Sequence, residues 1–291
     1  MNLEEGGWDP ELCALFGVPI ETLPEIRASI GQFGDIGGQR IAASLVDQQA
    51  ALYGHGCRLP GDAKITFGTG AFALAVTGPD IIRAPDRGLL PTVAWRVDDR
   101  ATFAVEGGVY DAGAAVEWAK RLGLFDDFSD LNAFDAPPAI ERGLAFVPAL
   151  SGLACPHWDR SAAALWIGMS ADTTRSDLRQ AVLEGVALRT AEVIAAMNER
   201  TPLQQRLSID GGLTRSAYFV QFLADAMGRS VATRAFDELT ALGCAELAAA
   251  GAGGFLAPGK DDLTIHHPRA SRQSEWREKF ADAIARTRAW R

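Results

Sequence analysis

The chain has 291 residues, of which 28 are Lys or Arg and 37 are Asp or Glu, so its formal net charge at pH 7 is −9. Hydrophobic residues make up 48% of the sequence and charged residues 22%, which is typical of a globular protein and excludes disordered, collagen-like and coiled-coil chains. The acidic balance disfavours nucleic acid and anionic membranes as partners, because both require a concentrated basic surface.

Neither a membrane span nor a secretory signal is predicted. The longest apolar stretch, residues 240–255, is interrupted by glycine and glutamate and is too short to cross a bilayer. Residues 1–9 contain two glutamates where a signal peptide would have a basic start. The four cysteines are scattered without a Cys-x-x-Cys pair, which is typical of free thiols in a reducing compartment. We therefore expect a cytoplasmic protein without a zinc site.

The length allows one large domain or two small ones, and residues 1–33 are predicted to form a connecting segment and not a domain. Apolar residues at helical spacing over 12–16 predict a short helix. Pro19 and Pro24 then predict an extended arm.

Antiparallel strands are expected to dominate the middle of the chain. Gly68-Thr69-Gly70 predicts a glycine hairpin between two strands, and Asp98-Asp99-Arg100 predicts a second hairpin. In chain order we expect a helix from about Asp47, strands over 64–67, 72–76, 92–97 and 101–105, a helix over 109–122 that ends at Gly123, and strands over 145–150 and 163–168.

Strand and helix alternate in the second half, which implies parallel strand pairing with helices packed against the sheet. His266 and His267 fall in a predicted exposed loop, where we expect no metal site. The expected elements are a helix of about 25 residues that begins near Thr174, strands over 206–210 and 230–234, helices over 216–227 and 240–252, and an amphipathic helix over 275–289.

Three glycine-containing turns lie where an apolar segment stops. They are Gly68-Thr69-Gly70, the pair Gly211-Gly212 after Asp210, and the helix start Thr240-Ala241-Leu242-Gly243. Glycine turns allow backbone N–H groups to approach phosphate oxygens, although each turn taken alone is more often a simple tight turn. The GxxxxGK[ST] and GxGxxG signatures are absent. A hairpin, a strand-to-helix glycine turn and a later helix start, in that order, are the layout of the actin-like ATPase fold.

Seven blocks of sequence resemble the FGGY family of carbohydrate kinases, and within it they are most similar to glycerol kinases. They occur in the family's order within residues 7–255, and they are DQQAALYG (47–54), FGTGAF (67–72), VEG (105–107), FVPALSGL (146–153), PHWD (156–159), DGG (210–212) and TALG (240–243). The resemblance implies an α/β fold, an actin-like (ribonuclease H-like) ATPase domain with a mixed sheet and helices on both faces.

The resemblance also implies that this chain corresponds to only one of two kinase domains. FGGY kinases have two actin-like domains with the active site between them, and this chain is similar to the interdomain linker (1–36) and the C-terminal domain (37–291). No counterpart of the first domain is found before Asp47. We therefore expect an exposed apolar patch, and either a homo-oligomer or a separate N-terminal kinase domain as partner.

By the same resemblance the chain binds a polyol or sugar through three residues. Asp47 matches the catalytic base that accepts the proton of the attacking hydroxyl, Gln48 matches a contact to a substrate hydroxyl, and Phe72 matches an apolar wall. From the residues alone, the simpler interpretations are that Asp47 is a helix N-cap and Phe72 a core strand residue.

Nucleotide contacts are implied at further positions. Thr69 matches the contact to the γ-phosphate, Glu117 stands where the family commonly has Gln, and Ser216 stands where it has Asn near the adenine. ATP and Mg²⁺ are the implied cofactors, with the metal held by phosphates and water. The full implied nucleotide set is Gly68, Thr69, Gly70, Gly113, Glu117, Gly211, Gly212 and Ser216.

The implied function is ATP-dependent phosphorylation of a primary hydroxyl, incomplete without an N-terminal domain. The alternative is a non-catalytic nucleotide-binding or partner-binding half of a split or truncated kinase. The resemblance leaves the substrate open among glycerol, erythritol and ketoses such as xylulose or ribulose.

Overall fold

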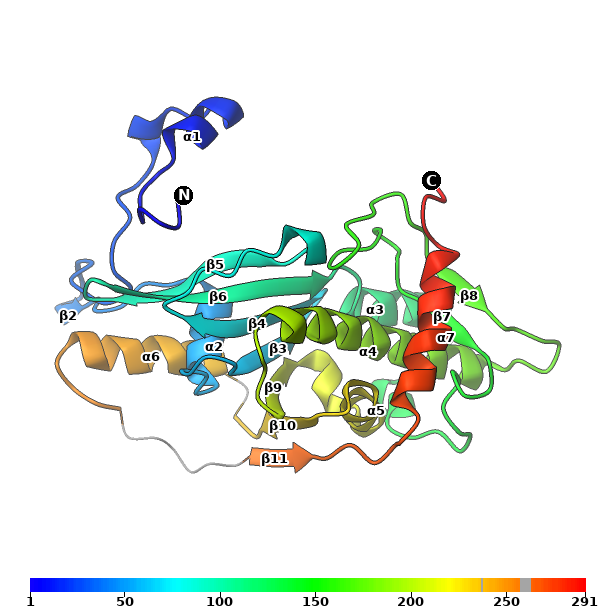
Figure 1. The fold of residues 1–291 in the computed structure, drawn as a ribbon. Helices are drawn as coiled ribbons and strands as arrows, with labels where there is room; N and C mark the ends of the chain where they lie inside the picture. The colour runs from blue at the N-terminus through cyan, green and yellow to red at the C-terminus, as the bar shows by residue number, and fades with distance from the viewer. Residues whose placement is uncertain (237, 257–262) are drawn as a thin grey trace.

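The computed structural model describes residues 1–236, 238–256 and 263–291, and their centre is a mixed β-sheet (Figure 1). In these ranges seven strands pair in the order β11-β10-β9-β3-β4-β6-β5. β3, β9 and β10 run parallel, whereas the other neighbours pair antiparallel. The strands are β3 (Ala63–Phe67), β4 (Ala71–Gly78), β5 (Leu90–Val97), β6 (Arg100–Val109), β9 (Arg206–Gly211), β10 (Ser230–Arg234) and β11 (Leu263–His266).

Helices cover both faces of the sheet, as predicted. One face carries α3 (Gly113–Arg121), α4 (Arg175–Arg200), α5 (Ala217–Met227) and α7 (Gln273–Ala285), and the other carries α2 (Asp47–Gly54) packed on α6 (Leu239–Gly251) (Figure 1). Two small ribbons flank the sheet, β1 (Asp35–Ile36) with β2 (Gln39–Arg40) and β7 (Ala145–Val147) with β8 (Leu165–Ile167).

The larger core lies between the sheet and α4. Residues of β3 alternate between the two faces, so that Ile65 and Phe67 join Val186 and Leu223 in this core while Lys64 points the other way. The smaller core on the opposite face packs Leu52 of α2 against strands β4 to β6. Full burial of a Val, Leu or Ile side chain contributes about 1.5 to 3 kcal/mol, so the α4 face supplies most of the hydrophobic stabilisation.

Glycines bring α2 and α6 into backbone contact. A Cβ at Gly54 would lie 1.9 Å from the carbonyl oxygen of Leu239, and one at Gly243 would lie 1.9 Å from that of Ala50. The third glycine motif of the sequence, Thr240 to Gly243, is therefore the first part of α6, and its glycine is required by helix packing.

An arm before the sheet carries α1 (Pro10–Phe16), which stands clear of the body in Figure 1. Asp9 caps the helix by accepting hydrogen bonds from the backbone of Glu11 and Leu12, and Gly17 ends it in the left-handed conformation. None of the α1 residues is buried. The predicted short helix is thus confirmed.

Three expectations about element boundaries were wrong. The helix predicted from residue 109 begins at Gly113, because Val109 is the last residue of β6. The C-terminal helix ends at Ala285. His266 is in strand β11, where it pairs with Val231, and is therefore not in a loop.

One buried carboxylate makes the stability of this fold pH-dependent. Glu184 of α4 is 2% exposed and accepts hydrogen bonds from the amides of Ala139 and Ile140 and from the hydroxyl of Tyr218. Burial raises its pKa to about 7, although these hydrogen bonds favour the charged form. The folded chain therefore holds this proton more tightly than the unfolded chain does.

We predict that the difference in free energy of unfolding between the wild type and Glu184→Gln falls as the pH rises. The contribution of protonated Glu184 is complete below its unfolded pKa of 4.5 and is lost as the pH passes about 7, and the total change is up to about 3 kcal/mol. Urea unfolding at pH 5, 6, 7 and 8 measures it. Asp177→Asn, on the same helix, is the control, because the capping hydrogen bonds of Thr174 hold the pKa of Asp177 below this range. A flat difference for Glu184→Gln would contradict the prediction.

Candidate nucleotide and substrate site

A cavity of about 760 Å³ opens where β3 and β9 end. Its walls come from the β3–β4 hairpin, the first turns of α3, the 3₁₀ turn η3 (Phe128–Leu131) and the 3₁₀ turn η4 (Gly212–Arg215). Six of the eight predicted nucleotide residues line it, namely Gly68, Thr69, Gly113, Glu117, Gly212 and Ser216. The structure therefore brings together the glycine turns at Gly68 and Gly212, which lie 144 positions apart in the sequence.

Backbone contacts hold the hairpin on the start of α3. The amides of Ala112 and Ala114 donate to the carbonyl oxygen of Thr69, each at 3.0 Å, and the amide of Gly113 donates to that of Gly68 at 3.0 Å. A Cβ at Gly113 would lie 2.4 Å from the Gly68 carbonyl oxygen. These hydrogen bonds occupy the backbone carbonyl groups of Gly68 and Thr69. The side chain of Thr69 is exposed at the tip of the hairpin, beside the positive end of the α3 dipole.

The other two predicted glycines, Gly70 and Gly211, do not line the cavity but lie where neighbouring backbone segments approach closely. Gly211 has a φ of +96°, and a Cβ there would lie 2.2 Å from the carbonyl oxygen of Phe67. At Gly70 a Cβ would lie 2.7 Å from the carbonyl oxygen of Val109. Both positions therefore require glycine for the close approach of neighbouring strands.

Ser216 lines the cavity, but the fold uses its hydroxyl group. The side chain is 6% exposed and caps α5 by accepting a hydrogen bond from the amide of Phe219 at 3.1 Å. Its own proton goes to the carbonyl oxygen of Leu131, 2.5 Å away. The position is as predicted, whereas a hydrogen bond from this hydroxyl to a base stays a prediction.

Arg215 and Asn132 are two of the lining residues that were not predicted as site residues from the sequence. Arg215 and Asn132 both border the cavity with exposed side chains, and neither has a side-chain hydrogen bond or ion pair within the described ranges. Arg215 comes three positions after Gly212 and ends η4, so a positive charge close to a candidate phosphate turn was a usable signal. Asn132 comes from a distant loop, and no local pattern marked it.

The predicted acceptor residues lie around Lys64 on the α2 face of the sheet. Lys64 is fully buried, and its ammonium group donates hydrogen bonds to the side-chain oxygens of Gln48 and, at 2.7 Å, of Thr66. Burial lowers the pKa of Lys64 to about 8, against the attraction of Asp210, Asp47 and Glu106. Asp47 and Gln48 thus share one electrostatic environment with this cation, which the sequence analysis missed.

Asp47 and Phe72 are both accessible. Asp47 is the first residue of α2 and is exposed, and its Oδ1 accepts the amide proton of Gln48 at 2.7 Å, whereas Val46 occupies the N-cap position. Phe72 pairs with Thr66 across the strands, which places it on the α2 face, and it is 40% exposed. The alternative interpretations, an N-cap aspartate and a core phenylalanine, do not hold.

Asp210 is anchored by a histidine from the end of α2. Nε2 of His55 lies 2.9 Å from Oδ2 of Asp210, and the histidine is 5% exposed. Burial opposes ionisation of Asp210, but the hydrogen bond and charge of His55 hold the pKa of Asp210 below its usual range. Among the described residues, no hydrogen-bond partner reaches the buried Oδ1 atom.

Comparison with known proteins identifies the protein family of this chain. Residues 63–252 match the model of the C-terminal domain of the FGGY family of carbohydrate kinases. The chain belongs to this family. The match contains β3, β9 and all four walls of the cavity.

Relatives of this FGGY chain include several glycerol kinases. The glycerol kinase of Alkalilimnicola ehrlichii is 39% identical over 302 residues, which cover 99% of this chain and 61% of the relative. That of Acaryochloris marina is 40% identical over 274 residues, which cover 90% of this chain and 53% of the relative. The FGGY chain thus spans little more than half the length of these relatives.

Solved structures confirm the predicted actin-like fold. A Plasmodium falciparum glycerol kinase with ADP superposes with a TM-score of 0.87 at 28% identity, over 99% of this chain and 61% of the other. A xylulose kinase from Rhodospirillum rubrum gives a TM-score of 0.78 at 23% identity, over 97% of this chain and 60% of the other.

The FGGY chain suits a magnesium ion that arrives on a nucleotide. Among the described residues, no group of three or more His, Cys, Asp or Glu side chains converges as a metal site. Mg²⁺ keeps several waters and is bound by substrate phosphates with one or two carboxylates. The exposed carboxylate of Asp47 offers such a ligand.

None of the helices in the described ranges has the length and apolar composition that a membrane crossing needs.

We predict that alanine destabilises the fold at one glycine of the cavity and has little effect at another. Gly113→Ala should lower the free energy of unfolding by about 1 to 3 kcal/mol, because its Cβ overlaps the Gly68 carbonyl. Gly212→Ala should change it by about 0.5 kcal/mol or less, since nothing lies within 4 Å of the position that its Cβ would take. Urea unfolding of the two variants checks this, and equal destabilisation would contradict the close approach at Gly113.

Proposed function

We propose that this chain is the nucleotide-binding side of an ATP-dependent polyol or sugar kinase of the glycerol kinase type. The observation that carries the proposal is the 760 Å³ cavity, at which the hairpin, the α3 start and the Gly211-Gly212 turn converge. This volume accommodates a nucleoside, and both apolar and polar side chains line its walls, as in a ligand site.

In this proposal the cavity holds adenosine and the hairpin tip meets the terminal phosphate. The exposed hydroxyl of Thr69 is free to donate to a γ-phosphate oxygen. Arg215 supplies a cation at the rim, since its guanidinium has no partner among the described residues. Magnesium, when bound to the phosphates, neutralises the charge that develops during transfer.

Asp47, Gln48 and Phe72 form the acceptor side of the proposed site. Lys64 can only donate, so Gln48 must turn its carbonyl oxygen inward and its NH₂ group outward, where it can donate to a substrate hydroxyl. Asp47 accepts the proton of the primary hydroxyl, whose oxygen forms a bond to the γ-phosphorus as the bond from that phosphorus to the ADP oxygen breaks. Phe72 supplies an apolar wall for the carbon chain.

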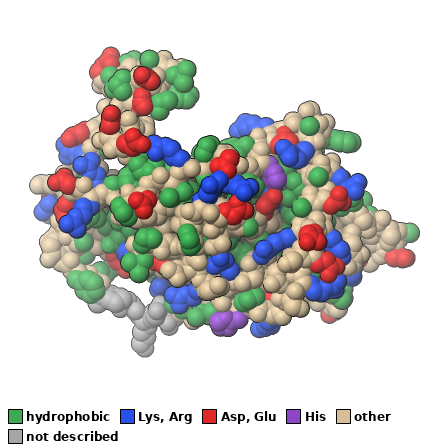
Figure 2. Space-filling view, in the orientation of Figure 1, with side chains coloured by type: hydrophobic (Ala, Val, Ile, Leu, Met, Phe, Trp, Pro, Cys, Tyr) green, Lys and Arg blue, Asp and Glu red, His purple; other side chains and the backbone are tan. Residues whose placement is uncertain are grey.

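The other side of the cleft belongs, we propose, to an FGGY N-terminal domain, whether it is carried on the same polypeptide or on another one. The glycerol kinase relatives extend well beyond the matched region. Apolar side chains gather on the projecting arm, at the upper left of Figure 2. Those of α1 and its flank are Leu12, Leu15, Phe16, Val18 and Ile20, which are 38 to 76% exposed. A second domain would exclude water from this surface and from the reacting phosphate.

We predict that Thr69→Ala weakens binding of a non-hydrolysable ATP analogue about tenfold more than binding of ADP. The reason is the loss of one hydrogen bond to a charged phosphate that only the triphosphate has. Isothermal titration calorimetry of the purified chain with magnesium measures both dissociation constants. Thr69→Ser keeps the hydroxyl and should restore the difference, whereas equal losses for both nucleotides would remove Thr69 from the γ-phosphate.

We predict that ADP release from MgATP occurs with one of glycerol, erythritol, xylulose, ribulose or gluconate when an N-terminal FGGY domain is present. Asp47→Asn should reduce kcat at least about a hundredfold, because the proton acceptor is lost. Asp282→Asn in α7, on the opposite face of the sheet, is the matched control. Nucleotide binding without turnover in any combination would instead support the non-catalytic alternative.

A further inference from the structure

One wall of the cavity is continuous with a segment that crosses α4 and α5. The segment runs from η3, whose Phe128, Ser129 and Leu131 face the cavity, through Asn132 to Arg142. It contains no further helix or strand, so its position depends on side-chain contacts. At its start, the Leu131 carbonyl oxygen accepts the hydroxyl proton of Ser216.

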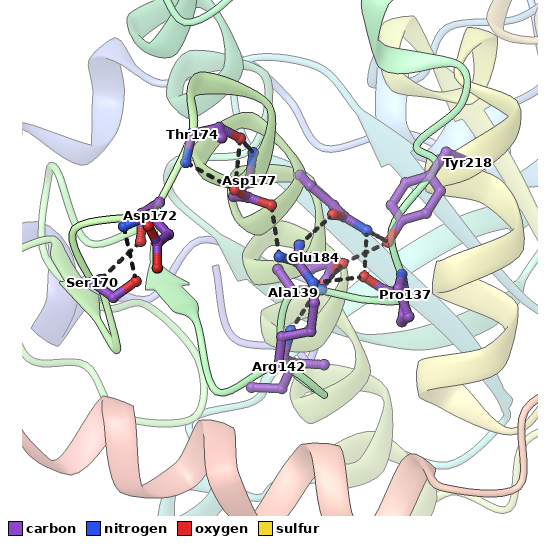
Figure 3. A network of polar contacts seen from close by, with 12 residues as sticks. Pro137, Ala139, Arg142, Ser170, Asp172, Thr174, Asp177, Glu184 and Tyr218 are labelled. Carbon is purple, nitrogen blue, oxygen red and sulfur yellow. Dashed lines mark hydrogen bonds and ion pairs between the residues drawn. The ribbon is translucent and has the colours of Figure 1, made fainter.

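Glu184 of α4 fixes the far end of this segment (Figure 3). Its two carboxylate oxygens accept the amide protons of Ala139 at 2.7 Å and Ile140 at 2.9 Å. The oxygen that binds Ala139 also accepts the hydroxyl proton of Tyr218 at 2.5 Å. A buried carboxylate is costly in the fold unless such donors surround it, so these bonds hold the three groups in a defined geometry.

Tyr218 connects the same carboxylate to the opposite wall. It lies in the first turn of α5, two residues after Ser216, which lines the cavity. Its ring packs edge-to-face on Phe134 of the segment, with centroids 4.6 Å apart. Glu184 therefore binds both the segment that continues η3 and the helix that follows η4.

A second layer of polar contacts supports this arrangement. Gln180, one turn before Glu184, donates to the hydroxyl of Tyr218 at 2.8 Å and to the Pro137 carbonyl oxygen at 3.2 Å. Arg142 donates to the side-chain oxygens of Gln180 at 2.9 Å and Asp177 at 2.6 Å. Three residues of α4, Asp177, Gln180 and Glu184, thus form hydrogen bonds to the segment, as Figure 3 shows for the residues it labels.

We propose that Glu184 is a positioning residue of the nucleotide cavity: its carboxylate ties residues 137–140 and Tyr218 together and so sets the spacing between the η3 wall and the η4 wall. Glu184 itself does not line the cavity and acts only through these neighbours. The inference rests on the proposed nucleotide binding, and it assigns a role in affinity to a side chain remote from the predicted phosphate and base contacts.

The test compares ADP affinity, by calorimetry, among single variants of the full chain. Glu184→Gln keeps the shape but removes one acceptor for the amides, and Tyr218→Phe removes only the hydroxyl. Each should weaken ADP binding about three- to tenfold. Amide hydrogen exchange of residues 128–142 without nucleotide should become faster in both variants.

Asp225→Asn is the matched control for general destabilisation. Asp225 is also a buried carboxylate that accepts backbone amides, those of Arg269 and Ala270, but it lies at the other end of α5. Its variant should bind ADP with wild-type affinity. An equal loss of affinity in Asp225→Asn, or unchanged ADP affinity in folded Tyr218→Phe and Glu184→Gln, would overturn the proposal.

The wild-type chain separates this inference from the proposed function. If the wild type does not bind ADP, the proposed nucleotide binding fails, while hydrogen exchange still decides whether Glu184 holds the wall. If the wild type binds and both variants bind equally well, only the positioning role of Glu184 fails.

Discussion

The candidate site depends on the close approach of three backbone segments at the end of β3. Gly113 lies against the Gly68 carbonyl and Gly211 against Phe67, at distances that no side chain would permit. This contact joins the hairpin, the start of α3 and the end of β9 into one rigid corner. The η4 wall follows Gly211 directly, and the η3 wall is joined to the end of η4 by the hydrogen bond from the Ser216 hydroxyl to the Leu131 carbonyl oxygen. The fold thus uses glycine first for its own packing, and the space for a ligand results from that packing.

Local patterns predicted what local interactions decide. The β3–β4 hairpin, the capped 26-residue helix α4 and the parallel pairing of β9 with β10 followed from periodicity, capping and alternation. Strand β11 was missed because its four residues depend on pairing with β10 and not on their own apolar pattern. The start of α3 was misplaced because β6 extends by its pairing with β4 as far as Val109. Long-range pairing overrode local propensity in both cases.

The residues of the candidate site that belong to short motifs could be predicted from the sequence. Those whose role depends on the burial of a charged side chain could not. Thr69 and Gly212 were visible as turn residues, and both line the cavity. Lys64 and Glu184 were not, because in sequence each is one charged residue among apolar neighbours, and only the structure shows that it is buried with several polar partners. Such residues organise the groups around them, which is why the acceptor residues and the cavity walls keep defined orientations.

The arm that carries α1 has a thermodynamic consequence. A helix of seven residues with no buried side chain is marginal in water, and its caps offset only part of that weakness. Leu15 and Phe16, 76% and 75% exposed, also leave hydrophobic free energy unrealised. Any surface that covers this arm gains that free energy and stabilises the helix at the same time. By mass action, the measured stability of the arm then becomes a function of the concentration of whatever covers it.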